Sequence, residues 1–473
     1  MIGLIVFPFL FLFCFIYSQR SDLNTAKVII LITWIGGSLA AYGLIPANGN
    51  DLILVVITSL SITSKAFEGR AIKMPFISFF LGMFIISIIS TYLNETGLVR
   101  FLLYHRYFLQ YYLILVFFVN SDLDDSDLVE LNRLFVNVLL LQIIVATMKW
   151  GLIDRGPDQF GDESFGGTYA LNDGSASLLI TLIAFSFLLP AYLLTSSKKY
   201  LFFILLFIWF VMIGSKRAII VMLPVMTLFI YVLISKKKVN IKSVLATIII
   251  LFGSIGLITS LNETLNPQGV KGGSALDINF IKQYIIDYSF GTGYFKPGDA
   301  FGGVRVQGYY SEGRLSTPIV LFRHLSDQEK LFTGSGTGVA VNSGRIESST
   351  EAYFQSIGIK TGISGFTWVS AQIGYIGGLI FTFFLLRVFW ITWAKYSSAE
   401  HNNSDSVYLI GLLGFLLVFL FDYMLYSQSM IRGEWYYSLL FYLIYKTYYH
   451  KGRKSEKSPS IMKKYSMADQ AKR

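Results

Sequence analysis

The chain has 473 residues, of which 54% are hydrophobic and only 14% are charged, and its formal net charge is +10. This composition excludes an ordinary soluble domain, because apolar runs of membrane-spanning length recur along the chain and only helices satisfy their own backbone groups in a layer without water. A single cysteine, Cys14, excludes a disulfide framework and a thiolate metal cage, and the placement of the positive charges argues against a nucleic-acid partner.

The apolar runs predict about thirteen transmembrane helices, within limits of twelve and fourteen, and therefore an all-α polytopic membrane protein. The first run has neither a basic segment before it nor a small-residue cleavage site after it, so it is interpreted as a retained helix. The third run has only thirteen residues, and a re-entrant segment is the alternative there. The expected helices lie at 2–17, 28–47, 52–64, 75–93, 98–119, 131–150, 174–195, 200–215, 218–234, 244–261, 364–394, 407–427 and 434–449.

The basic residues between these helices predict the orientation of the chain. Nine Lys or Arg residues follow Tyr445, and the positive-inside tendency places this tail in the cytoplasm. Alternation then puts twelve Lys or Arg residues in short cytoplasmic loops and only four in short exterior loops. Four parts follow: a membrane domain of ten helices in 1–261, a large exterior loop domain in 262–363, a membrane domain of three helices in 364–449 and a basic cytoplasmic tail in 450–473.

Cations at the exterior side are the main departure from this pattern. Lys216 and Arg217 adjoin the outer end of the eighth helix, and the fifth helix carries Arg100, His105 and Arg106 in its exterior half. Interfacial cations that extend their charged ends to the membrane surface are one interpretation. An anion site on the exterior side is the other, because a charge within a helix is costly unless it faces a polar environment.

The exterior loop domain is the expected place for chemistry. Its segment "STPIVLFRHL" predicts a helix that begins with Thr317 as N-cap, so that Arg323 and His324 lie away from the apolar face and Arg314 lies just upstream. The following "FTGSGTG" predicts a turn whose glycines allow the backbone to approach a ligand closely, and it lacks the lysine of a nucleotide P-loop. Aromatic residues among glycines earlier in the domain suit sugar rings, although a small aromatic core is the alternative.

A second exterior loop, residues 155–174, contains Arg155 and three carboxylates, Asp158, Asp162 and Glu163. Clustered carboxylates can bind a divalent cation, but these lack regular ligand spacing. No metal and no cofactor are therefore expected.

The layout resembles the O-antigen polymerase (Wzy-type) and O-antigen ligase group of membrane glycosyltransferases. Those proteins have twelve to fourteen helices and one large exterior loop followed by a few final helices, which implies a GT-C-like fold over almost the whole chain. Their basic S-x-R signature before the large loop corresponds here to Ser215 and Arg217, and "GGTYALND" from Gly166 to Asp173 is a loose counterpart of an exterior-loop motif.

Two further patterns bear on the resemblance. Some polymerases carry an Arg and a Gly separated by ten residues in each of two exterior loops, and Arg155 with Gly166 and Arg323 with Gly334 fit this spacing. Ligase members usually show a His-Asn pair before a G-x-x-G, but here "GYIG", which begins at Gly374, follows "ISGFTWVSAQI" without a histidine. The polymerase is therefore favoured over the ligase.

The resemblance implies a glycosyltransferase that acts on polyprenyl-pyrophosphate-linked oligosaccharides at the outer face of a bacterial cytoplasmic membrane. Without a metal, arginines would stabilise the leaving pyrophosphate. The expected general base is His324, with Glu351 and His105 as alternatives. The expected anion and substrate contacts are Arg217, Lys216, Arg155, Arg314, Arg323, Arg100, His105 and Arg106.

Membrane lipid, a chain-length regulator and a flippase are the implied partners of such an enzyme. A lipid-oligosaccharide flippase or other transporter is the alternative from another class. It would also be polytopic and basic, but it would need no exterior domain of a hundred residues and should show repeated halves.

Overall fold

The computed structural model describes most of the membrane part and about half of the expected exterior domain. The expected helix 244–261 and the tail after residue 450 lie outside the described residues, apart from isolated positions. The described residues are 2–46, 48–152, 167–168, 174–214, 218–235, 245, 249, 253, 293–295, 300–301, 304–305, 309–311, 314–341, 350–357, 359, 363–398, 403–427 and 429–450.

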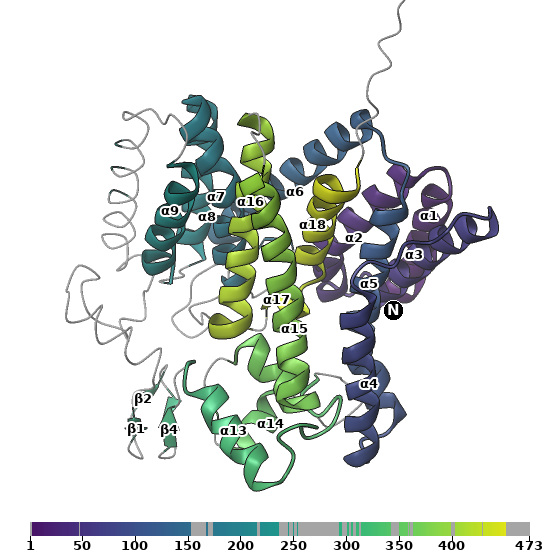
Figure 1. Ribbon diagram of the computed structural model, residues 1–473, viewed down its shortest axis with the longest axis vertical. Helices are drawn as coiled ribbons and strands as arrows, with labels where there is room; N and C mark the ends of the chain where they lie inside the picture. Colours follow the sequence, from purple (N-terminus) through teal and green to yellow (C-terminus); the bar gives the residue numbers. More distant parts are fainter. Residues whose placement is uncertain are drawn as a thin grey trace, which may run out of the picture.

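The described part is predominantly helical, and every expected apolar run except 244–261 overlaps a helix (Figure 1). Two short antiparallel strand pairs, β1 with β4 and β2 with β3, lie within the expected exterior domain. The elements are α1 (Ile2–Ser18), α2 (Asp22–Ala41), α3 (Gly49–Phe67), α4 (Ile77–Leu93), α5 (Leu98–Asn120), α6 (Asp125–Leu152), α7 (Gly174–Thr195), α8 (Lys198–Ile213), α9 (Ile219–Ile234), β1 (Gly293–Phe295), β2 (Ala300–Phe301), β3 (Val304–Arg305), β4 (Tyr309–Ser311), α13 (Thr317–Asp327), α14 (Thr350–Ser356), α15 (Gly365–Ser398), α16 (Asn403–Phe421) with the π-helical turn η1 (Asp422–Tyr426), α17 (Ser429–Arg432), and α18 (Glu434–Ile444) with the π-helical turn η2 (Tyr445–Tyr449).

Seven of the described helices, α2, α3, α5, α6, α7, α15 and α16, are long and apolar enough to cross a membrane. The protein is therefore a polytopic membrane protein. The third of the expected runs is a helix of 19 residues, Gly49–Phe67, rather than thirteen, so it has the length of a span. The sequence pattern placed both ends of this helix too far inward, because Asp51 and Lys65 are charged residues that usually mark the end of an apolar run. In the structure both belong to the helix and are buried against partners on other helices.

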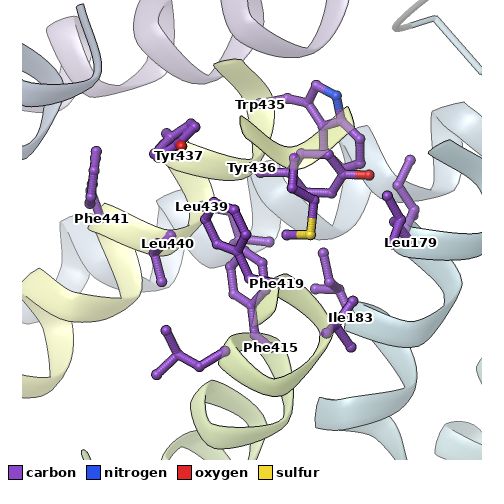
Figure 2. Close-up of a cluster of buried hydrophobic side chains, with 14 of the residues drawn as sticks. Leu179, Ile183, Phe415, Phe419, Trp435, Tyr436, Tyr437, Leu439, Leu440 and Phe441 are labelled. Atoms are coloured by element: carbon purple, nitrogen blue, oxygen red, sulfur yellow. The ribbon is translucent and has the colours of Figure 1, made fainter. Parts of the chain in front are cut away.

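The membrane helices pack around large buried side chains. Figure 2 shows Leu179 and Ile183 of α7 and Phe415 and Phe419 of α16 against the aromatic residues of α18, among them Trp435. All five side chains are at most 2% exposed. Lipid tails are as apolar as these side chains, so close van der Waals packing, rather than exclusion of water, holds such helices together in a bilayer.

Polar contacts tie several helices together at one end of the bundle, which is called the Lys65 end. The Lys65 ammonium of α3 lies 2.5 Å from the Asp22 carboxylate of α2 and donates a hydrogen bond of 2.6 Å to the Asn120 carbonyl of α5. The Tyr445 hydroxyl, at the end of α18, donates to the Ser121 carbonyl at 3.4 Å. These contacts place the ends of α2, α3, α5 and α18 at one level.

The opposite end carries residues 314–341 and 350–357, which together are called the cap (Figure 1, bottom). The helix α13 begins at Thr317, one residue before the predicted start, so that Ser316 rather than Thr317 is in the N-cap position. Leu321 and Leu325 are fully buried under α13, so the amphipathic pattern of this short helix fixes which side faces the bundle.

Candidate functional site

The helix α15 is broken near its start, at the level of the cap. Ile373 and Gly374 have non-helical backbone angles, and Gly374 has φ of 78° and ψ of 172°, which glycine adopts far more readily than other residues. The break separates a first segment of eight residues, Gly365 to Gln372, from a long second segment that begins at Tyr375. It also leaves carbonyl groups of the first segment without partners in their own helix.

The glycine-rich turn of the cap satisfies these carbonyls. The Ser335 amide donates to the Ala371 carbonyl at 2.8 Å, and the Gly336 amide donates to the Gln372 carbonyl at 3.1 Å. In return, the Tyr375 amide donates to the Leu331 carbonyl at 2.9 Å. The "FTGSGTG" segment therefore does approach another group closely through its backbone, and the group is the broken end of α15.

The two chain segments cross at a pair of glycines. A Cβ atom on Gly334 would lie 2.5 Å from the Gly374 nitrogen, and a Cβ atom on Gly374 would lie 2.2 Å from the Phe332 carbonyl oxygen. Real Cβ atoms do not approach backbone this closely, so both positions require glycine. Gly334 is also the glycine that the sequence pairs with Arg323, and the structure gives it this packing role.

The same turn is hydrogen-bonded to the α4–α5 hairpin and to Gln372. The Asn94 amide donates to the Gly334 carbonyl at 3.1 Å, and the Thr91 and Thr337 hydroxyls lie 2.5 Å apart. The Gly338 amide donates to the Gln372 side-chain oxygen at 2.9 Å. The cap is therefore held to the membrane helices by contacts along its turn rather than tethered by its ends alone.

The break lies about one membrane thickness from the Lys65 end. Lys395 of α15, whose ammonium donates to the Thr447 carbonyl at that end, is 21 residues beyond Gly374. At 1.5 Å per residue this is about 31 Å, close to the roughly 30 Å of a hydrocarbon core. The broken segment and the cap thus meet where α15 reaches the membrane surface.

The first segment of α15 has a polar side and an aromatic side. Trp368 is fully buried, donates from its indole nitrogen to the Ala340 carbonyl at 2.7 Å and lies 5.6 Å from the Tyr104 ring. Ser364 caps the segment by accepting from the Thr367 amide at 3.2 Å. These contacts seat the stretch "SGFTWVSAQ" between the cap and α5.

Three predicted site residues lie on or beside α13. Arg314 places its guanidinium 4.8 Å from the ring centroid of Tyr426, at the end of α16. Arg323 is exposed and His324 is half-buried, as expected for residues away from the buried side of α13. The cap therefore brings Arg314 onto the membrane helices and presents Arg323 from a helix seated on α15.

The helix α14 carries Glu351, whose side-chain position lies outside the described part of the structure. Its neighbour Tyr353 is described, and its hydroxyl lies 2.7 Å from that of Ser335 in the turn. Burial raises the pKa of Tyr353, and the hydrogen bond with Ser335 partly opposes this increase. The neutral phenol is therefore part of the contact between α14 and the turn.

The structure separates the three residues predicted on α5. Arg100 lies under the turn, with its backbone 2.6 Å from where a Cβ on Gly338 would be. His105 is buried among aromatic rings, 4.4 Å from the ring centroid of Phe101 and 5.0 Å from that of Phe84. Arg106 points to another side of the helix, toward α3. The three side chains do not form one group.

Arg106 instead belongs to a buried polar cluster that the sequence did not predict. Its guanidinium lies 3.6 Å from the Asp51 carboxylate, donates to the Asn48 side-chain oxygen and donates to the Tyr107 hydroxyl at 2.7 Å. Beside it, the Asn50 amide donates to both oxygens of the Glu434 carboxyl, at 2.9 and 2.7 Å. The Asn48–Asn50–Asp51–Arg106–Glu434 set is called the charged cluster.

The missed members of this cluster had only a weak signal in the sequence. Asp51 and Glu434 each stand beside the start of an apolar run, in "GNDLIL" and "GEWYYS", so the pattern places each at a helix end rather than in a site. Only the packing of α3, α5 and α18 brings them together, 55 and more residues apart along the chain. A carboxylate in the first turn of a membrane helix was the one feature that could have marked them.

Arg155, Lys216 and Arg217 lie outside the described residues. The helices on either side of the last two, α8 and α9, end at Ile213 and begin at Ile219, close to where the apolar runs predict. No protein-family model, curated protein or solved structure matches the chain.

Proposed function

We propose that the protein is a polymerase that joins polyprenyl-pyrophosphate-linked oligosaccharide repeat units into a surface polysaccharide. The observation that supports this most is the cap, a cation-bearing segment hydrogen-bonded onto a membrane helix at the point where that helix is broken. A break in a membrane helix frees backbone groups that need polar partners, and the cap supplies them here. A flippase requires no such cap, so the docked cap favours an enzyme.

The architecture that we propose has about thirteen spans and a GT-C-like arrangement, with the cap end facing outward from a bacterial cytoplasmic membrane. The support for the orientation is the ratio of twelve to four Lys or Arg residues between the two sets of short loops. The lipid-linked substrate presents its pyrophosphate at the outer surface of the bilayer, which is the level that we assign to the break in α15.

In the proposed reaction the leaving pyrophosphate is stabilised by arginines. Arg217, with Lys216 beside it, is the first candidate for this contact, because a planar guanidinium can donate two parallel hydrogen bonds to phosphate oxygens. Arg314 and Arg323 approach from the cap. Such donors act most strongly where water is excluded, as it is between packed helices.

The chemical step transfers a glycosyl group. The acceptor hydroxyl oxygen forms a bond to the anomeric carbon, the bond from that carbon to the pyrophosphate oxygen breaks, and the leaving group keeps the electron pair. The hydroxyl proton goes to His324, our preferred base, whose half-buried position on the cap leaves it within reach of solvent.

The direct test uses purified protein and lipid-linked repeat units. Arg217→Ala is expected to lower the polymerisation rate by roughly two to three decades, which corresponds to about 3 to 4 kcal/mol of lost transition-state stabilisation. Arg217→Lys should recover only part of the rate, because a point charge cannot make the two-pronged contact. Arg70→Ala is the matched control, since Arg70 is a half-exposed arginine paired with Asp122 at the Lys65 end.

Near-normal turnover by Arg217→Ala would remove this residue from the mechanism and make it an interfacial anchor. Deletion of the protein in its host then separates the functional classes. A polymerase predicts that single repeat units still reach their final acceptor while longer chains disappear. Loss of the single-unit product as well would favour a ligase or a flippase, and lipid-linked repeats accumulating on the outer leaflet would identify the ligase.

A further inference from the structure

The charged cluster lies within the membrane rather than at its surface. Asp51 and Lys65 on α3, and likewise Arg106 and Asn120 on α5, are 14 residues apart, which is about 21 Å along a helix. Glu434 lies 11 residues, about 16 Å, before Tyr445. With a hydrocarbon core of roughly 30 Å, the members of the cluster lie between about half and two thirds of the way from the Lys65 end to the cap end.

The charges of the cluster do not balance if every group is ionised. It contains two carboxyl groups, Asp51 and Glu434, and one guanidinium, Arg106. The Asp51 and Arg106 side chains are 12% and 20% exposed, and Glu434 is 9% exposed. A net negative charge at this depth would be costly, so an additional positive charge must belong to the site.

The hydrogen bonds show which of the two carboxyl groups has no positively charged partner among the described residues. The guanidinium is committed to α3 and to its own helix, through Asp51, Asn48 and Tyr107. From the described residues the Glu434 carboxyl receives only neutral donors, namely the Asn50 nitrogen, which both of its oxygens share, and the amide of Gln110. An ionised carboxylate that is well stabilised in a protein interior accepts several donors or a charged one.

A second observation indicates that a donor is missing at the same place. Asn50 is 8% exposed, and its side-chain oxygen makes no hydrogen bond within the described part of the chain. Gln110 of α5 is fully buried with its amide directed at Glu434, and its side-chain oxygen has no partner among the described residues. Buried polar atoms without partners usually mark a group that completes the network.

We propose that Asp51 and Glu434 form an intramembrane proton-binding site that holds one proton in the resting protein. The proton neutralises the cluster and supplies Glu434 with a hydroxyl donor, while Asp51 keeps its contact with the Arg106 guanidinium. The Asp51 carboxyl faces that of Glu434, so the two can share the proton. The inference does not depend on the proposed polymerase activity.

Other groups packed against Glu434 do not supply this charge. On α2, Trp34 lies 4.7 Å from Trp435 between ring centroids, and on α5 the Tyr107 hydroxyl accepts from Arg106. Asp422 of η1 accepts from the Ser427 hydroxyl and, at 2.8 Å, from the Met430 amide, so its carboxylate is stabilised where it is. Among the described side chains, therefore, none supplies the additional positive charge; the side chain of Arg432, two residues before Glu434, lies outside the described part of the chain.

Infrared spectroscopy of the full-length protein in lipid nanodiscs tests the proposal without any substrate. A protonated carboxyl has a carbonyl band that is separate from the amide bands and shifts in D₂O. We expect this band at pH 7 in the wild type and its loss in Glu434→Gln and in Asp51→Asn, because either change leaves one carboxylate against one guanidinium. Glu130→Gln, which replaces an exposed carboxylate paired with Lys27, is the matched control and should keep the band.

A third variant counts the protons. Arg106→Gln leaves two carboxyl groups and no cation, so the band should roughly double in area. Absence of the band in the wild type, or its persistence in both Glu434→Gln and Asp51→Asn, would overturn the proposal. A site filled by sodium would show no such band, together with a thermal midpoint that rises with sodium chloride and not with choline chloride, and it would overturn the proposal equally.

Discussion

Replacing Gly374 with alanine is expected to detach the cap from α15. Gly374 has φ of 78° and ψ of 172°, and an alanine in this region costs about 1 to 3 kcal/mol. Its Cβ would also lie 2.2 Å from the Phe332 carbonyl oxygen, so the turn must move away. Movement breaks three backbone hydrogen bonds, from Ser335, Gly336 and Tyr375, which contribute about 0.5 to 1.5 kcal/mol each.

The docking of the cap should therefore weaken by about 3 to 7 kcal/mol, which is roughly two to five decades in the docking equilibrium. Hydrogen exchange of the purified protein measures this directly. The amides of Ser335, Gly336 and Gly338 are protected by α15 in the wild type and should exchange faster by a corresponding factor, up to the limit set by complete undocking.

Two control variants separate the causes. Gly69 also has φ of 78°, but nothing contacts the position that its Cβ would take, so Gly69→Ala is the control for an alanine at positive φ without a clash and away from the cap. Gly151 lies near the end of a helix with open space around it, and Gly151→Ala should leave the cap unaffected. Unchanged exchange at Ser335 in Gly374→Ala, within the range of these controls, would refute the assignment of the crossing as the docking point.

Two further predictions concern the cap. Burial raises the pKa of Tyr353, so its neutral form stabilises the docked cap below about pH 10 and this contribution is lost as the pH rises through the folded-state pKa; exchange of the α14 amides should accelerate above that pH in the wild type, and Tyr353→Phe should abolish this dependence. A cysteine at Ser311 in a Cys14→Ser background should react with a membrane-impermeant reagent in intact cells, and failure to react would reverse the proposed orientation.

The membrane architecture could be read from the sequence because it depends on local composition. A helix in lipid needs only a long apolar run, and the runs at 98–119 and 174–195 agree with α5 and α7 to within a residue. The start of α13 is also local, since a proline in the first turn favours the beginning of a helix. Predicting these features requires no knowledge of which distant residues pack against them.

The candidate site was only partly accessible to such reasoning. The sequence singled out Arg323 and His324 on one helix and Arg314 just upstream of it, and in the structure all three belong to the cap, with Arg314 against Tyr426. The sequence also singled out Gly334 and Gly374 as motif glycines, but it did not predict that they contact each other. Their contact joins positions 40 residues apart, and no local sequence pattern indicates which distant backbone segment packs against a glycine.

The charged cluster shows most clearly what only the tertiary structure decided. Along the chain, Asp51, Arg106 and Glu434 lie far apart, at or within three separate apolar runs, and nothing in the sequence pairs them. Packing of α3, α5 and α18 places them in one desolvated site. The reason is physical: composition sets whether a helix enters the membrane, but the cost of a buried charge depends on its neighbours in space, and these are set by how the helices pack.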